Sequence, residues 1–179
     1  GVHAFVALHG GRAALGRRTT AAVCTSFVLP ATSATGASYC DQLQAAGSKH
    51  VGPAKVFLSH AWRYAFADVL AALEGWVAAG GPGDGPGSSA ARANTYLWFD
   101  LFSNAQHNTA SRPFDWWTGC FARNIGRIGH TLLVLDWSDP APLTRAWCVW
   151  ELCCTLQAGA VLEVAMSKAA EKGFFAALV

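Results

Sequence analysis

The sequence predicts an α/β domain whose parallel sheet is covered by helices on both faces, and three observations lead to this fold class. From Lys55 onward, short apolar runs alternate with segments of helical periodicity, as expected of right-handed β-α-β units. The run at 131–135 is apolar on both faces, which is typical of a central parallel strand. The 179 residues, 53% of them hydrophobic and 13% charged, suit one domain with a sizeable core.

An N-terminal extension, partly ordered, is predicted at residues 1–50, before an α/β domain at residues 51–179. Residues 1–18 show no clear pattern. The apolar, partly β-branched run at 22–29 predicts a strand or an extended arm. Residues 39–46 predict a short helix that ends before a glycine.

The first half of the α/β domain contains two predicted strands with a helix between them. The strands are the apolar runs at 56–58 and 96–99, and the helix at 66–77 has its apolar residues on one face. The composition of residues 80–89 predicts a flexible loop. Residues 101–114 are polar and are expected to be irregular.

The second half continues the same alternation. A helix is expected to begin at Asp115 as its cap, with an apolar stripe on one side. The strand at 131–135 follows, then a proline-containing turn at 139–142 and a helix at about 144–158. A fourth strand is expected at 161–166, with a partial helix after it.

Charge and cysteine usage exclude several classes of function. The net charge of +2 is small and the basic residues are scattered, so no nucleic-acid partner is expected. No apolar run is long enough to span a bilayer. Six Cys residues occur without a Cys-x-x-Cys pair or a common zinc spacing, which predicts free thiols in the cytoplasm and no metal. Neither a Gly-x-Gly-x-x-Gly nor a Walker motif follows a predicted strand.

Several segments, in the same order, resemble Toll/interleukin-1-receptor (TIR) domains. They are Val56-Phe57-Leu58-Ser59-His60-Ala61-Trp62, Trp98-Phe99-Asp100 and Trp147-Cys148-Val149-Trp150-Glu151-Leu152. Longer stretches, including Ser38-Tyr39-Cys40 and Pro142-Leu143-Thr144-Arg145-Ala146-Trp147-Cys148, resemble a TIR-like group of microbial eukaryotes that is often fused to helical repeats. The resemblance implies a flavodoxin-like three-layer domain with four or five strands, of which four are readable.

Glu151 is the acid in an otherwise apolar helix. No Lys or Arg lies one helical turn away, so no local ion pair compensates it. Loss of hydration near apolar surface would raise its pKa, a common property of functional acids. The alternatives are an Arg from elsewhere in the fold or exposure at the helix end, and the helix alone leaves these interpretations open.

By the resemblance, Glu151 is the catalytic residue of NAD-cleaving TIR domains, with NAD⁺ as a substrate rather than a bound cofactor. Nicotinamide is a cationic leaving group, so no general acid is required. One carboxylate near the ribose can stabilise the oxocarbenium-like transition state.

In a flavodoxin-like sheet the first and third strands are neighbours, and ligands bind at their carboxyl ends. That edge would place residues 59–63 beside Glu151. The segment after the second strand carries Asn104, Gln106 and His107, and by the resemblance it forms a loop over the same opening.

The candidates for contact with the nucleotide are Ser59, His60, Trp62, Arg63, Asp100 and Trp147. Arg63 is the candidate for the diphosphate, and Trp62 is the candidate for stacking on the nicotinamide or adenine ring. Each also has a structural interpretation, as a strand-end polar group, a core aromatic residue, a packed histidine or a solvated arginine.

The leading functional hypothesis is an NAD⁺ glycohydrolase, with or without cyclisation, that is activated by self-association. The alternative is a non-catalytic adaptor that binds other TIR-like domains, because the Ser59-His60-Ala61-Trp62 segment departs from ordinary TIR patterns. A third hypothesis is a domain that binds a nucleotide in the same crevice without turnover.

Overall fold

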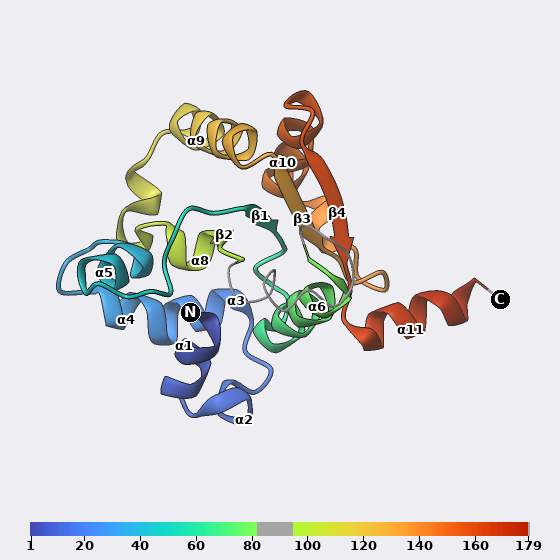
Figure 1. Ribbon diagram of the computed structural model, residues 1–179, viewed down its shortest axis with the longest axis horizontal. Helices are drawn as coiled ribbons and strands as arrows, with labels where there is room; N and C mark the ends of the chain where they lie inside the picture. Colours follow the sequence, from blue (N-terminus) through green and yellow to red (C-terminus); the bar gives the residue numbers. More distant parts are fainter. Residues whose placement is uncertain (82–94, 179) are drawn as a thin grey trace.

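A computed structural model describes residues 1–81 and 95–178 and has a four-stranded parallel sheet at its centre (Figure 1). The strands are β1 (Val56–Ser59), β2 (Leu97–Phe99), β3 (His130–Val134) and β4 (Val161–Ala165). Their order is β2-β1-β3-β4, and all pairs are parallel. The predicted α/β, flavodoxin-like three-layer architecture is therefore confirmed.

The register aligns the carboxyl ends of the three strands β2, β1 and β3. Leu58 of β1 pairs with Phe99 on one side and with Leu132 on the other. The residues that follow these strands therefore leave the sheet along one edge. This edge is where flavodoxin-like folds bind ligands.

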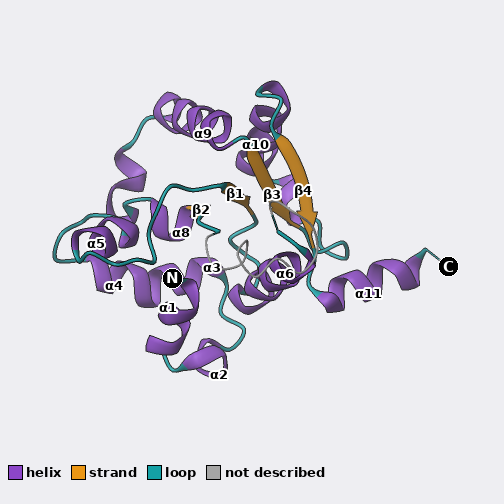
Figure 2. Ribbon diagram, viewed as in Figure 1, coloured by secondary structure: helices purple, strands orange, loops and turns teal. Residues whose placement is uncertain are grey.

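Two layers of helices cover the sheet, as Figure 2 shows. One layer consists of α9 (Phe114–Ile128) and α10 (Ala146–Gln157), and α6 (Phe66–Ala79) lies on the other side. Because side chains of a strand alternate between faces, Val56 and Leu58 enter one apolar cluster and Phe57 enters the other.

The N-terminal segment consists of short helices. They are α1 (Val2–Leu8), α2 (Gly11–Leu15), α3 (Thr20–Val23), the π-helical turn η1 (Cys24–Val28), α4 (Leu29–Thr32) and α5 (Tyr39–Ala45). Phe5, Leu15 and Val23 are buried in the same apolar cluster as β1. The predicted helix at 39–46 is confirmed, and Ser38 caps it with a hydrogen bond from the N–H of Asp41.

The strand or extended arm predicted at 22–29 is wrong, because this segment is helical. Thr19 accepts a hydrogen bond from the N–H of Ala22 and starts the helical run. Val23 and Val28 then face the core on one side of that run. Burial on a helical face thus outweighs the preference of β-branched residues for strands.

Residues 101–114 are more regular than predicted, because they contain α8 (Asp100–Ser103) and the 3-10 helix η2 (Gln106–Ser111). Leu101 and Phe102 are buried, which explains the local order. The prediction that Asp115 caps the next helix is also wrong, since α9 follows Pro113 and has no side-chain cap.

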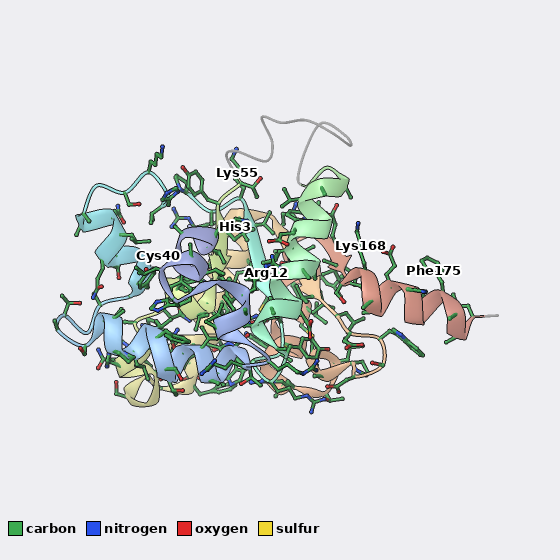
Figure 3. All side chains as sticks on the ribbon, turned by 90° about the horizontal axis from the view of Figure 1, so that it is seen from below. His3, Arg12, Cys40, Lys55, Lys168 and Phe175 are labelled. Atoms are coloured by element: carbon green, nitrogen blue, oxygen red, sulfur yellow. The ribbon has the colours of Figure 1, made fainter. Side chains whose placement is uncertain are left out.

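The chain continues from β3 through the 3-10 helix η3 (Ala141–Thr144) to α10, and from β4 to α11 (Lys168–Ala177). Figure 3 labels Lys168 and Phe175 on α11, which extends away from the remainder of the molecule. The flexible loop predicted at 80–89 lies, beyond residue 81, outside the described residues. Within the described part of the chain, no helix has the length and apolar character needed to cross a membrane.

Candidate functional site

A cavity of about 440 Å³ lies at the carboxyl edge of the sheet and contains the predicted catalytic acid. Its walls come from the connection after β1, from α8 and η2, from α9 and from the start of α10. The lining residues are His60, Trp62, Asp100, Asn104, Gln106, Thr109, Trp117, Phe121, Arg145, Trp147, Cys148 and Glu151. Buried ionisable groups and aromatic rings thus converge at the edge where the fold places ligands.

Two other cavities are of similar size. One, of about 330 Å³, lies between the N-terminal segment and β2 and is lined mainly by apolar side chains such as Phe5 and Tyr39. The other, of about 460 Å³, is bounded by α6, α11 and the loop after β3. The cavity at Glu151 is the candidate site because one buried acid, Glu151, and one partly buried acid, Asp100, line it.

Glu151 is buried in the wall of the cavity, with 7% of its surface exposed. Ser59 Oγ, at the end of β1, donates a hydrogen bond of 2.6 Å to Glu151 Oε2. Burial raises the pKa of Glu151 to about 8, against the lowering effect of the Ser59 hydrogen bond. Among the described residues no Lys or Arg forms an ion pair with Glu151, and the nearby charge of Arg145 lowers its pKa only in part.

Asp100 is the second acid of the cavity, and it lies directly after β2. Its carboxylate accepts hydrogen bonds from Trp62 Nε1 at 2.5 Å and from the N–H of Leu101 at 2.7 Å. Burial raises the pKa of Asp100 to about 6, although the Trp62 hydrogen bond acts in the opposite direction. The negative charge of Asp100 also contributes to the raised pKa of Glu151.

His60 is a packed, neutral histidine. Its Nε2 lies 3.2 Å from Thr20 Oγ1, and its ring meets Phe99 edge-on. Burial lowers the pKa of His60 to about 3, so the imidazole carries no charge at neutral pH. Backbone hydrogen bonds from Thr20 to Tyr64 and from Ala21 to Trp62 attach the same connection to the N-terminal segment.

Aromatic rings form one wall of the cavity and continue to the surface. Trp147 lies 5.9 Å from Phe121 and 5.3 Å from Phe114, measured between ring centroids. Trp117 stacks on Phe121 at 5.8 Å. Phe114 is 66% exposed, so the aromatic wall reaches solvent at the start of α9. Such a wall suits a flat ring.

The arginine expected at the site, Arg63, lies outside the cavity, and a different arginine lines it. Arg63 is exposed, pairs with Asp139 and does not line the cavity. Arg145 lines the cavity and was not selected from the sequence. It lies six residues before Glu151, outside the one-turn spacing of a helical ion pair. Its position immediately before an apolar helix that carries Glu151 is the feature of the sequence that could have identified it as a site residue.

The structure thus brings most of the predicted residues together. Glu151, His60, Trp62, Asp100 and Trp147 line the cavity, and Ser59 reaches it through its hydrogen bond to Glu151. Asn104 and Gln106 also line it, as expected for the segment after β2. His107 instead contacts Thr32, with 3.0 Å between Nε2 and Oγ1.

The chain matches no protein-family model, no curated protein and no solved structure. The resemblance to TIR domains therefore remains an expectation that rests on the sequence motifs alone. In the described ranges, 1–81 and 95–178, no group of three or more His, Cys, Asp or Glu residues is arranged to hold a metal ion.

Proposed function

We propose that this protein is an NAD⁺ glycohydrolase of the TIR type and that Glu151 is its catalytic residue. The observation that supports this most directly is the position of Glu151. It lies in the wall of a cavity at the carboxyl edge of the sheet, is held by Ser59 and has no ion-pair partner among the described residues.

The proposed reaction breaks the bond between the nicotinamide nitrogen and C1′ of the ribose. The bonding electron pair goes to the nitrogen and neutralises the pyridinium ring. A water oxygen then bonds to C1′, and its proton is released, which gives ADP-ribose and nicotinamide. Glu151 would stabilise the positive charge that develops on the ribose.

The raised pKa of Glu151, about 8, sets its protonation state in the free protein. At pH 7 the Glu151 carboxyl is protonated in most molecules before the substrate binds. A cationic nicotinamide ring in the cavity favours the ionised form and so lowers this pKa. The kcat/KM for NAD⁺ should therefore rise with pH up to the pKa of the free protein and level off above it.

Nicotinamide release is the direct test. Concentrated protein is incubated with NAD⁺ at pH 8, and free nicotinamide is measured by chromatography. Glu151→Gln keeps the size of the side chain and is expected to abolish release. Glu171→Gln, on the exposed surface of α11, is the matched control and should retain it. Release that persists in Glu151→Gln would refute the catalytic assignment.

The alternative is an interaction module, and β4 provides the observation in its favour. This strand is at the edge of the described sheet, and Val161, Leu162 and Val164 are exposed on it. Exposed apolar edge strands are typical sites of association. Self-association without nicotinamide release at any protein concentration would favour this alternative.

The proposed location is the cytoplasm. All six cysteines are free thiols, and Cys24, Cys148 and Cys154 are buried. Free thiols are the usual state in a reducing compartment, where NAD⁺ is also available.

A further inference from the structure

Arg145 is the cation of the Glu151 cavity. It is the residue immediately before α10, it is half-buried, and it lines the cavity together with both acids. Its charge is among the causes that lower the pKa values of Asp100 and Glu151, so its positive field reaches both groups.

Within the described residues, no ion pair or hydrogen bond engages the side chain of Arg145, and this half-buried residue is the arginine that lines the cavity. Arg63 pairs with Asp139, and Arg12 pairs with Glu74. Neither acid of the cavity lies within ion-pair distance of the Arg145 guanidinium. A guanidinium has five N–H donors in one plane and binds phosphate oxygens in pairs. Its donors are therefore available to an anionic ligand in the cavity.

The spacing between Arg145 and Glu151 suits a ligand that carries a positive charge and a negative charge on either side of a ribose. Arg145 is the N-cap of α10, and the helix rises by about 7.5 Å from Ala146 to Glu151. A nicotinamide nucleotide has a cationic ring on one side of its ribose and a phosphate on the other. With the ribose beside Glu151, the phosphate would extend toward the start of α10.

We propose that Arg145 binds the phosphate attached to the reacting ribose, so that the cavity accepts nicotinamide nucleotides and discriminates against the nucleoside. The identity of this ligand depends on the proposed function, whereas the phosphate contact is testable without turnover. Arg145 takes the role that the sequence suggested for Arg63.

The binding test uses ADP-ribose, which contains the phosphates and cannot release nicotinamide. Titration calorimetry of Arg145→Ala should show affinity weaker by roughly 10- to 100-fold, the loss expected for hydrogen bonds to a charged group. Arg145→Lys keeps the charge without the paired donors and should lie between Arg145→Ala and the wild type. Arg127→Ala, on the exposed side of α9, removes the same charge and should bind normally.

The kinetic test uses nicotinamide mononucleotide and nicotinamide riboside, which differ by one phosphate. Arg145→Ala should raise KM for the mononucleotide by the same factor and leave KM for the riboside unchanged, with kcat nearly constant for both. If the role of Arg145 were merely structural, Arg145→Ala would change KM for both substrates by the same factor.

Separate outcomes decide the two proposals. Binding of ADP-ribose that depends on Arg145, without nicotinamide release by the wild type, would overturn the proposed function and retain the phosphate contact. ADP-ribose affinity unchanged in a folded Arg145→Ala protein, or weakened in Arg63→Ala instead, would overturn the inference. Absence of ADP-ribose binding by the wild type at millimolar concentrations would also overturn it.

Discussion

Replacing Glu151 by Gln is expected to remove a loss of stability that the wild-type protein undergoes between pH 6.5 and 8. The pKa of this carboxyl is about 8 in the folded protein, compared with an ordinary value of 4.5. In this pH range the unfolded chain has lost the proton while the folded protein still holds most of it. The folded state binds more protons, so the free energy of unfolding decreases as the pH rises.

The expected size of this effect follows from the two pKa values. Where the folded protein binds one proton more than the unfolded chain, the free energy of unfolding falls by about 1.4 kcal/mol per pH unit. The slope is smaller near pH 8, where the Glu151 carboxyl is half ionised in the folded protein. The free energy of unfolding therefore falls by about 1.5 kcal/mol between pH 6.5 and 8. The penalty disappears below pH 4.5, where both states are protonated. His60, with a pKa of about 3, is neutral throughout this pH range in the folded protein, whereas Asp100, with a pKa of about 6, still loses part of its proton at the lower end of the range.

Urea denaturation at four pH values between 6.5 and 8 provides the measurement. The difference in unfolding free energy between wild type and Glu151→Gln should change by about the calculated amount, because the titrating groups that do not interact with Glu151 cancel in this difference. Glu171→Gln is the control and should follow the wild type. Parallel pH dependences for wild type and Glu151→Gln would mean that Glu151 does not hold its proton in the folded state.

Three further predictions concern neighbouring side chains. Ser59→Ala removes the donor that lowers the pKa of Glu151, so the pH profile of nicotinamide release should move upward by about one pH unit, and an unchanged profile would contradict the hydrogen bond. Phe57→Ala leaves a cavity beneath α9 and should reduce the unfolding free energy by roughly 3–5 kcal/mol in urea. Arg63→Ala breaks only an exposed ion pair with Asp139, so the same assay should show a change below about 1 kcal/mol.

The strands were predictable because a strand buried on both faces needs apolar side chains at nearly every position. The predicted run at 131–135 and the observed β3 differ by one residue at each end. The polar residues that end β1 and β2 could be assigned to one edge because parallel strands place their carboxyl ends together. Residues 22–29 could not be assigned, since a short apolar run fits a strand and a buried helical face equally well.

The choice between Arg63 and Arg145 was also beyond the sequence. Arg63 lies in the connection after β1, which favoured it, but its pairing with Asp139 depends on the loop after β3. Arg145 enters the cavity because η3 ends there and α10 begins. The positions of both arginines relative to the cavity depend on the packing of segments that are distant in the sequence.

The bonds between Thr20 and the connection after β1 affect where this protein can be shortened. A truncation at residue 51, the boundary the sequence suggests, would remove the hydroxyl that holds His60 and the backbone contacts to Trp62 and Tyr64. It would also uncover apolar side chains that Val23 and its neighbours now cover. The N-terminal helices thus act as a scaffold for the candidate site, and inactivity of such a fragment would report on its folding rather than on its chemistry.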